Sequence, residues 1–415
     1  MGPTNSIKSE TNIKLPFAFI FFSIFAFVLS QLLFLANSQY FVDGIFRIPA
    51  IWSGAHLLIL GWAVMVCMGA MYQLVPVAFL TPIWNEKFGF FQFAVTAFGI
   101  AAFSITLYFD FKSSIIPGII MLAGFLFFLF QMLMTLKKQE KANILTLFVA
   151  TALICLLLTI SFGILMLIHL IGGRSSQFYN GLFMNHMFLG LAGWFSLLIF
   201  GFSYKMGPMF SLSHGYSMKP ARFVYGFYLA GLAVSSISFF IASSIFTKLG
   251  FFLLFIGFSL FARHMQLILQ KRVKKKLDRP FMFSLLAIVF GEIIHFAAFI
   301  AAVTDSLGKY AGALAISYLL YWIAFSIIGY LYKIVPFLWW THKYSNAIGK
   351  ENVPMLKDMI NEKLALPLFI AFISGTLAVT LSLIWKIDFL FYIGQCTNTI
   401  AASVFGFALL KVINK

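Results

Sequence analysis

The fold of this chain is decided by one stretch, HLLILGWAVMVCMGAMYQLVP (His56–Pro76), which is long and apolar enough to cross a lipid bilayer as a helix. The stretch opens on a histidine and closes with the spacing G-x2-Y-x3-P. A polar side chain inside lipid is costly and usually functional. Two questions follow: whether the rest of the chain is built from similar segments, and whether this imidazole has partners.

The composition of the whole chain matches that stretch. Of its 415 residues 62% are hydrophobic and 10% are charged, and the mean hydropathy is +0.98. A protein this apolar needs lipid as its main solvent, so we predict an all-α, polytopic membrane protein. Strand-like alternation is missing from the sequence, which argues against a transmembrane barrel. Twelve apolar runs predict twelve transmembrane helices, at residues 16–36, 51–76, 88–108, 115–136, 143–171, 181–208, 222–246, 249–270, 280–304, 311–338, 364–384 and 388–411.

The net charge of +17 is concentrated in a few loops. If the twelve spans alternate in direction, the most basic loops (137–141, 271–279 and 343–363) fall on one side, together with both ends of the chain. This is the positive-inside pattern, so both termini are expected in the cytoplasm, in the cytoplasmic membrane of a bacterium. The basic excess is then expected to set the topology and to contact anionic lipid, and no nucleic-acid partner is expected.

One spacing, W-x6-G-x2-Y-x3-P, returns in every fourth span. We expect its glycine to permit close helix approach, its proline to end the helix, and its tyrosine hydroxyl to reach the membrane interface. Each feature is also ordinary in membrane helices, and transporters carry internal repeats too. The copies are Trp62–Pro76, Trp194–Pro208 and Trp322–Pro336. They predict one transmembrane domain, 1–415, with three pseudo-repeats of four helices at about 16–136, 143–270 and 280–411.

Three groups of four helices, with a histidine on the second helix and a G-x2-(Y/N)-x3-P ending, resemble subunit I of the haem-copper oxidase superfamily. That superfamily includes cytochrome c oxidases and bacterial nitric oxide reductases. The residues that carry the resemblance are Ala55–Val77, Asn185–Pro208 and Tyr321–Trp340. The short form, which consists of subunit I alone, is also similar to NnrS-type haem- and copper-containing membrane proteins. The resemblance covers nearly the whole chain in architecture, and it implies a haem cofactor with copper as a second candidate.

The resemblance also implies roles for two histidines. His56 matches the second-helix histidine that binds the low-spin haem, and His186 lies in the sixth helix, where the oxidases keep a copper ligand. The chain departs from the family in two places. No adjacent histidines follow the sixth helix, and the tenth-helix stretch Ala311–Trp322 holds none where the oxidases place two. A complete oxygen-reducing centre is therefore not expected.

Location divides the seven histidines of the chain into two groups. Three lie near helix ends or in loops and are expected at the surface: His214, His264 and His342. Four lie inside spans, in the outer half of the membrane under the expected topology, and are candidate cofactor ligands: His56, His169, His186 and His295. Histidine is the commonest haem and metal ligand, and His186 and His295 are also candidates for copper. The alternative is that each only hydrogen-bonds a neighbouring helix.

Glu292 is the acid that lies well inside a span, and it precedes His295 by about one helical turn. An ionised, unpaired carboxylate in that position is costly. Three roles compete for it: it orients His295, it binds a metal itself, or it supplies protons to a reduction site. A satisfied structural pair is the alternative.

These patterns predict a haem-binding membrane protein that acts in respiratory electron transfer or in oxygen or nitric oxide chemistry. The expected partners are lipid, an electron-donor or accessory subunit, and a small gas (O2 or NO). An oxidoreductase with Glu292 in proton supply and a non-enzymatic haem or metal role are equally favoured. Two alternatives remain open, namely a transporter with a Glu292/His295 site and an assembly factor of respiratory complexes. The loop 341–363 is expected to form a short amphipathic helix.

Overall fold

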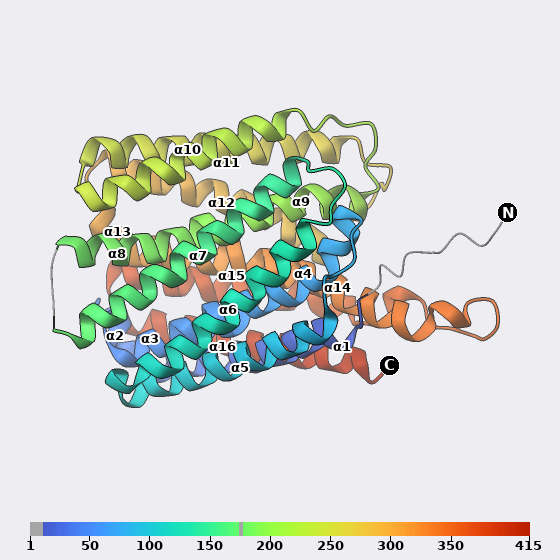
Figure 1. Ribbon diagram of the computed structural model, residues 1–415, viewed down its shortest axis with the longest axis horizontal. Coiled ribbons are helices and arrows are strands. Elements are labelled where there is room, and N and C mark those ends of the chain that lie inside the picture. Colours follow the sequence, from blue (N-terminus) through green and yellow to red (C-terminus); the bar gives the residue numbers. More distant parts are fainter. Residues whose placement is uncertain (1–10, 174–176) are drawn as a thin grey trace.

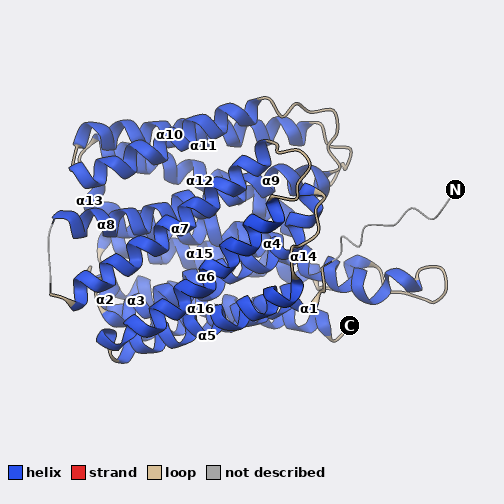
Figure 2. Ribbon diagram, viewed as in Figure 1, coloured by secondary structure: helices blue, strands red, loops and turns tan. Residues whose placement is uncertain are grey.

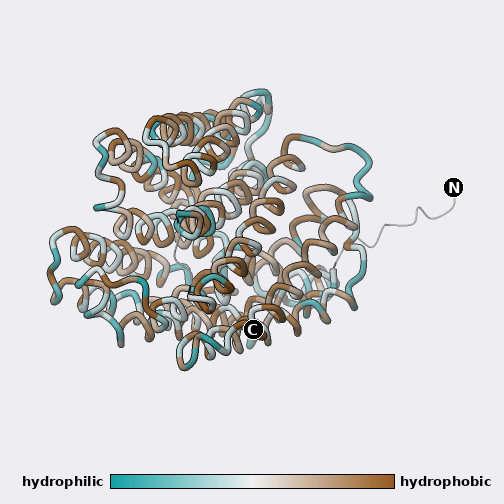
Figure 3. The backbone as a smooth tube through the Cα atoms, turned by 60° about the vertical axis from the view of Figure 1, so that its left-hand side comes forward, coloured by the Kyte–Doolittle hydropathy of each residue, from teal (hydrophilic) through white to brown (hydrophobic). Residues whose placement is uncertain are grey.

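The computed structural model describes residues 11–173 and 177–415, and within these ranges helices joined by loops make up the chain, with no strand (Figure 2). Twelve helical runs are long and apolar enough to cross a membrane. The runs lie side by side, and hydrophilic residues gather in the loops that join them (Figure 3). This is the architecture of a multi-pass membrane protein.

The long helices run back and forth between the two ends of the bundle, and the last helix packs against the first (Figure 1). Their bounds are α1 (Lys14–Ala36), α2 (Ser38–Val42), α3 (Pro49–His56), α4 (Met65–Phe79), α5 (Glu86–Phe109), α6 (Ile115–Leu136), α7 (Ile144–Ile171), α8 (Gln177–Phe188), α9 (Ser196–Ser211), α10 (Pro220–Ile241), α11 (Ser244–Gln270), α12 (Arg279–Val303), α13 (Leu307–Ser317), α14 (Phe325–Tyr344), α15 (Glu362–Trp385) and α16 (Asp388–Ile413).

All twelve predicted spans are present as helices. At the seventh and eighth spans, the turn between α10 and α11 lies about one helical turn earlier than predicted. Hydropathy does not mark this turn, because apolar residues continue through it. Ala242 adopts a left-handed conformation (φ 51°), and the Ser243 side chain then caps α11 by accepting from the Phe246 amide.

The three spans with the repeated spacing share a local feature that the sequence did not predict. A π-helical segment joins α3 to α4 (Leu57–Val64), α8 to α9 (Leu189–Phe195) and α13 to α14 (Tyr318–Ala324). Each segment contains the tryptophan of the spacing. Such π-helical turns widen a helix locally and are frequent at functional sites.

These same three runs form the interior of the bundle. In their most apolar windows 78%, 78% and 61% of the residues are buried, against 28% to 44% in the other nine runs. The tryptophans at their centres, Trp62, Trp194 and Trp322, are fully buried. Helices that are apolar on all sides and covered by protein belong in the core, so nine runs surround these three.

The hydroxyls of the tyrosines in the spacing were predicted to reach water or lipid headgroups, but the structure covers them with protein. Tyr72, Tyr204 and Tyr332 are all buried, and each hydroxyl bonds a neighbouring segment. The partners are Gln92 Oε1 at 3.0 Å, His264 Nδ1 at 3.2 Å and the Asn361 carbonyl at 3.3 Å. The prediction was wrong because these hydroxyls are buried, and a buried hydroxyl is stabilised by a hydrogen bond to a protein group.

The prolines of the spacing do not end their helices either. Helices α4 and α9 continue to Phe79 and Ser211, and α14 continues to Tyr344. A proline inside a helix removes one amide donor, which frees the carbonyl four residues earlier. The carbonyl freed by Pro76 belongs to Tyr72, and it accepts from the Thr11 hydroxyl at 2.8 Å.

The amphipathic helix predicted within residues 341–363 is also not found. Helix α14 runs on to Tyr344, short 3₁₀ turns follow at Ser345–Ala347 and Leu356–Asp358, and α15 begins at Glu362. The loop is held by the Trp340 indole N–H, which donates to the Pro354 carbonyl at 2.7 Å. No α-helix forms here because Gly349 adopts a positive φ (76°) and Pro354 has no amide hydrogen to donate.

Three helix pairs, α5–α6, α10–α11 and α15–α16, pack closely through glycines. A Cβ atom on Gly99 would lie 2.6 Å from the Met121 backbone, and one on Gly231 would lie 2.7 Å from the Leu254 amide nitrogen. A Cβ on Gly394 would lie 2.7 Å from the Gly375 carbonyl oxygen. Small residues at such crossings allow the backbones of two helices to touch.

We expect Gly231→Ala to destabilise the protein by about 1–3 kcal/mol, because the new methyl group meets backbone that cannot rotate away. Gly226→Ala on the same helix is the matched control, since a Cβ there meets nothing within 4 Å. The measurement is thermal unfolding of both variants in detergent. Equal midpoints for the two would contradict the close packing of α10 on α11.

Candidate functional site

The structure brings two of the predicted histidines together in the interior. His56 is the last residue of α3 and His186 lies near the end of α8, so each precedes a π-helical segment. Their ring centres are 6.2 Å apart and the two ring planes are inclined by 28°. Both rings are half-buried. Two imidazoles from distant parts of the chain thus face one site.

Hydrogen bonds fix which nitrogen of each ring carries the proton. Nδ1 of His56 lies 2.7 Å from the Trp52 carbonyl, and Nδ1 of His186 lies 2.8 Å from the Thr159 carbonyl. A carbonyl oxygen only accepts, so Nδ1 is the donor in both rings. Nε2 of each ring then carries a lone pair, and it has no hydrogen-bond partner among the described residues. This is the tautomer that presents Nε2 to a metal.

Helix α7 sets the position of the His186 ring. Thr159 supplies the carbonyl that holds Nδ1, and Gly163 lies one turn further along the same helix face. A Cβ atom on Gly163 would lie 2.8 Å from Cε1 and 3.0 Å from Nδ1 of His186. The ring therefore reaches its carbonyl only because residue 163 has no side chain. On the other side, the Phe103 ring meets His56 edge-on at 5.3 Å.

His295 lies apart from this pair, in a buried hydrogen-bond network. Its Nδ1 donates to the Gly291 carbonyl at 2.7 Å, and its Nε2 lies 3.3 Å from the Tyr228 hydroxyl. Both ring nitrogens are therefore engaged. The network continues through the Tyr318 hydroxyl, 3.1 Å from that of Tyr228, to Ser196 Oγ at 2.6 Å. The Trp322 indole N–H also donates to Ser196, at 2.9 Å.

We expect Ser196→Ala to cost about 1–2 kcal/mol of stability, because the buried Trp322 indole N–H loses its acceptor. Ser374→Ala is the control, since that exposed hydroxyl bonds only the carbonyl of Ala371 in its own helix. Thermal unfolding in detergent measures both variants. A Ser196→Ala midpoint equal to that of the wild type would show that the network adds nothing to stability.

Glu292 and His169 are each held elsewhere. Glu292 Oε1 accepts from the Ser259 hydroxyl at 2.5 Å, and Glu292 Oε2 is buried without a partner. Glu292 makes no hydrogen bond to His295, so the role of orienting that ring has no support in the geometry. His169 donates from Nδ1 to the Leu165 carbonyl at 2.9 Å, near the end of α7, and its ring lies 6.0 Å from that of Phe178.

The three histidines expected at the surface do not all lie there. His214 and His342 are exposed, but His264 is buried at 3% exposure. Its Nε2 donates to the Ser217 carbonyl at 2.9 Å, so its Nδ1 accepts from the Tyr204 hydroxyl. The prediction for His264 was wrong because closeness to a helix end does not show which face of the helix the residue occupies.

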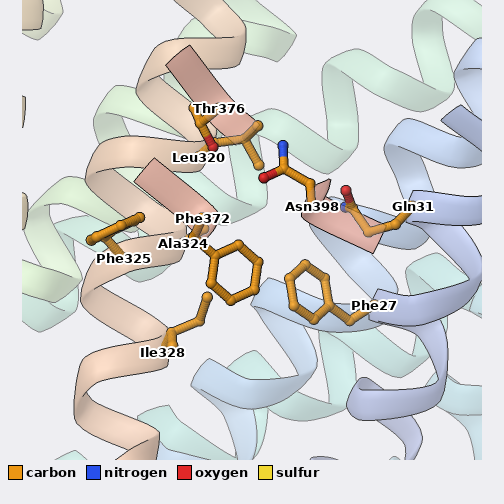
Figure 4. Close-up of a pocket in the computed structure, with 9 residues that line it drawn as sticks. All are labelled: Phe27, Gln31, Leu320, Ala324, Phe325, Ile328, Phe372, Thr376 and Asn398. Atoms are coloured by element: carbon orange, nitrogen blue, oxygen red, sulfur yellow. The ribbon is translucent and has the colours of Figure 1, made fainter. Parts of the chain in front are cut away.

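An enclosed cavity of about 10 Å³ lies among α1, α14, α15, α16 and the π-helical segment before α14 (Figure 4). The polar side chains in its wall are Gln31, Thr376 and Asn398, and both amide atoms of Asn398 are buried without a partner. A cavity of this size and polarity accommodates one water molecule. It is too small for a cofactor, so it does not compete with the His56–His186 pair.

Several residues that hold the histidines or connect to them were not predicted from the sequence. Thr159, Gly163, Tyr228, Tyr318 and Ser196 hold or join the histidines, yet none belongs to the repeated spacing. Polar or small residues within apolar runs were the available signal, and such residues are too common in membrane helices to single these out.

Comparison with known proteins does not identify a family for this chain. No protein-family model matches the chain, and no curated protein matches it. The assignment of a function therefore depends on the residues and distances described above.

Proposed function

We propose that this chain is a haem-binding membrane protein of the haem-copper oxidase subunit I type, with His56 and His186 as the ligands of the iron. The observation that carries the proposal is the 6.2 Å separation of their ring centres, with both Nδ1 atoms occupied and both Nε2 atoms free. The two Nε2 atoms would hold the iron, since imidazole nitrogens bind metals at about 2.0 Å.

The donor set favours haem over a bare metal ion. A porphyrin supplies four nitrogens, so two imidazoles complete the coordination of its iron. Zinc takes three or four protein ligands, and no group of three or more His, Cys, Asp or Glu in residues 11–173 and 177–415 is placed to hold a metal ion. Copper stays the second candidate, because imidazole also suits copper.

The ligand set also indicates the kind of activity. With two histidines on the iron, the group would supply one-electron transfer and would leave no open position for O2 or NO. We therefore assign electron transfer within the membrane, and not gas reduction, to this site. The protein's part is to hold both imidazoles through backbone carbonyls and to surround them with apolar helices.

The arrangement of the interior supports the subunit I type. The three innermost runs are the second, sixth and tenth spans, and a π-helical segment lies at the same place in each. His56 and His186 lie just before these segments in the second and sixth spans. In the tenth span Tyr318, which begins the segment, hydrogen-bonds Tyr228 and Ser196.

The test is an absorption spectrum of the purified protein, recorded as reduced minus oxidised. We expect the sharp bands of a low-spin, six-coordinate haem, with no change when carbon monoxide is added. Haem extraction and elemental analysis for copper give the cofactor content of the same sample. A colourless protein from cells supplied with haem would contradict the proposal.

A transporter is the second candidate, and one observation favours it. Glu292 lies within a span with one carboxyl oxygen buried and unpaired, and an acid in that position often belongs to a proton path. Proton flux into proteoliposomes, followed with an entrapped pH-sensitive dye, distinguishes the two. Flux that is lost in Glu292→Gln, in a protein without haem bands, would favour the transporter.

A further inference from the structure

A second, larger cavity opens on the side of the bundle, between the end of α12 and the start of α13. This end of the bundle is opposite the chain termini (Figure 1). The cavity has a volume of about 490 Å³, within the range of sites that hold small ligands. Its wall consists of Phe296, Ala297, Ile300, Ala301, Thr304, Ser306, Lys309 and Tyr310. It shares no residue with the His56–His186 site.

The wall changes from apolar to polar along the helix axis. The apolar part of the wall is formed by α12, where Phe296 and Ile300 are exposed by 48% and 42%. The polar part, at the end of α12 and the start of α13, carries the hydroxyls of Thr304 and Ser306, which lie 2.8 Å from each other, and the ammonium group of Lys309. A site with an apolar floor and a polar rim fits a molecule with a tail and a head.

The positive charge at the rim has no counter-charge within residues 11–173 and 177–415. Lys309 makes no ion pair among the described residues, and its ammonium nitrogen lies 5.1 Å from the centre of the Tyr310 ring. The acid nearest in sequence, Asp305, is already paired with Lys248 at 2.9 Å. The rim therefore offers a lysine and hydroxyls to a negatively charged group.

We propose that this cavity binds one anionic phospholipid, with its phosphate at Lys309, Thr304 and Ser306 and an acyl chain along Phe296 and Ile300. Charge complementarity favours an anionic head, because a neutral head would leave the Lys309 ammonium uncompensated. One lysine near a membrane surface contributes about a fivefold preference for anionic over zwitterionic lipid. The site does not depend on the function proposed for the histidine pair.

The test is native mass spectrometry of the detergent-purified protein with added phosphatidylglycerol or phosphatidylcholine. We expect one retained phosphatidylglycerol, preferred about fivefold. In Lys309→Gln we expect the preference for phosphatidylglycerol to disappear, because the charge is lost while the apolar part of the wall is unchanged. In Ala297→Phe the ring fills the exposed floor, and retention of both lipids falls. Lys112→Gln is the matched control, because Lys112 is an exposed lysine in the loop between α5 and α6 that does not line the cavity.

Two results would overturn the proposal. One is an unchanged lipid preference in Lys309→Gln together with unchanged retention in Ala297→Phe, measured on variants that unfold at the wild-type temperature. The other is retention of an isoprenoid quinone in place of phospholipid, identified by its mass and ultraviolet absorption, because that head is neutral.

Discussion

Alanine at His56 or at His186 is expected to leave the purified protein with less than about a tenth of its haem, since changes even in the groups around a metal ligand lower affinity 10- to 100-fold. In the proposed site each histidine would supply one of the two protein ligands of the iron, so the loss of either would leave the haem with one. His295 is not expected to replace the lost ligand, because it lies apart from the pair and both of its ring nitrogens are engaged. Haem per chain, from extraction and total protein, is the measurement.

His169→Ala is the matched control for these two variants. His169 also donates from Nδ1 to a backbone carbonyl and also lies within a span, but it has no contact with the pair. It should keep the wild-type haem content. A second control separates ligand loss from misfolding: imidazole added to His56→Gly should restore the bands. Full haem in both His56→Ala and His186→Ala would exclude the pair as the ligands.

The spans could be predicted from the sequence, and the local geometry within them could not. Length and hydropathy decide whether a helix crosses a membrane, and both can be read along the chain. The π-helical segments depend on how three interior helices pack, so no local pattern of residues marks them. The prolines were expected to stop their helices because only the local sequence was considered. The carbonyl that Pro76 frees is in fact satisfied by Thr11, which is far away in sequence.

The histidines illustrate the same limit in the candidate site. The sequence places His56, His186 and His295 at similar depths in three spans, and depth alone predicts that they converge. Two of them do, but His295 turns to Tyr228 and Tyr318, because helix rotation decides which face meets which neighbour. Rotation is set by packing between helices, and that information is spread over many residues of several spans.

Gly163→Ala is expected to weaken haem binding through the position of the His186 ring. The added methyl group would lie 2.8 Å from Cε1 of His186, closer than side-chain atoms approach. The ring must then leave Gly163, and it loses the hydrogen bond to the Thr159 carbonyl that fixes its tautomer. We expect haem affinity to fall about tenfold, measured by titrating haem into the apoprotein.

A purely structural role for Gly163 predicts a different result. If the glycine only lets α7 and α8 approach, Gly163→Ala should lower the unfolding temperature of the haem-free protein and leave its haem affinity intact. If it positions His186, affinity falls even where the haem-free variant unfolds at the wild-type temperature. Gly226→Ala, where a Cβ meets nothing, should change neither quantity. Because the ring lies against the glycine through Cε1 and Nδ1, and not through the backbone of α8, we expect the loss of affinity.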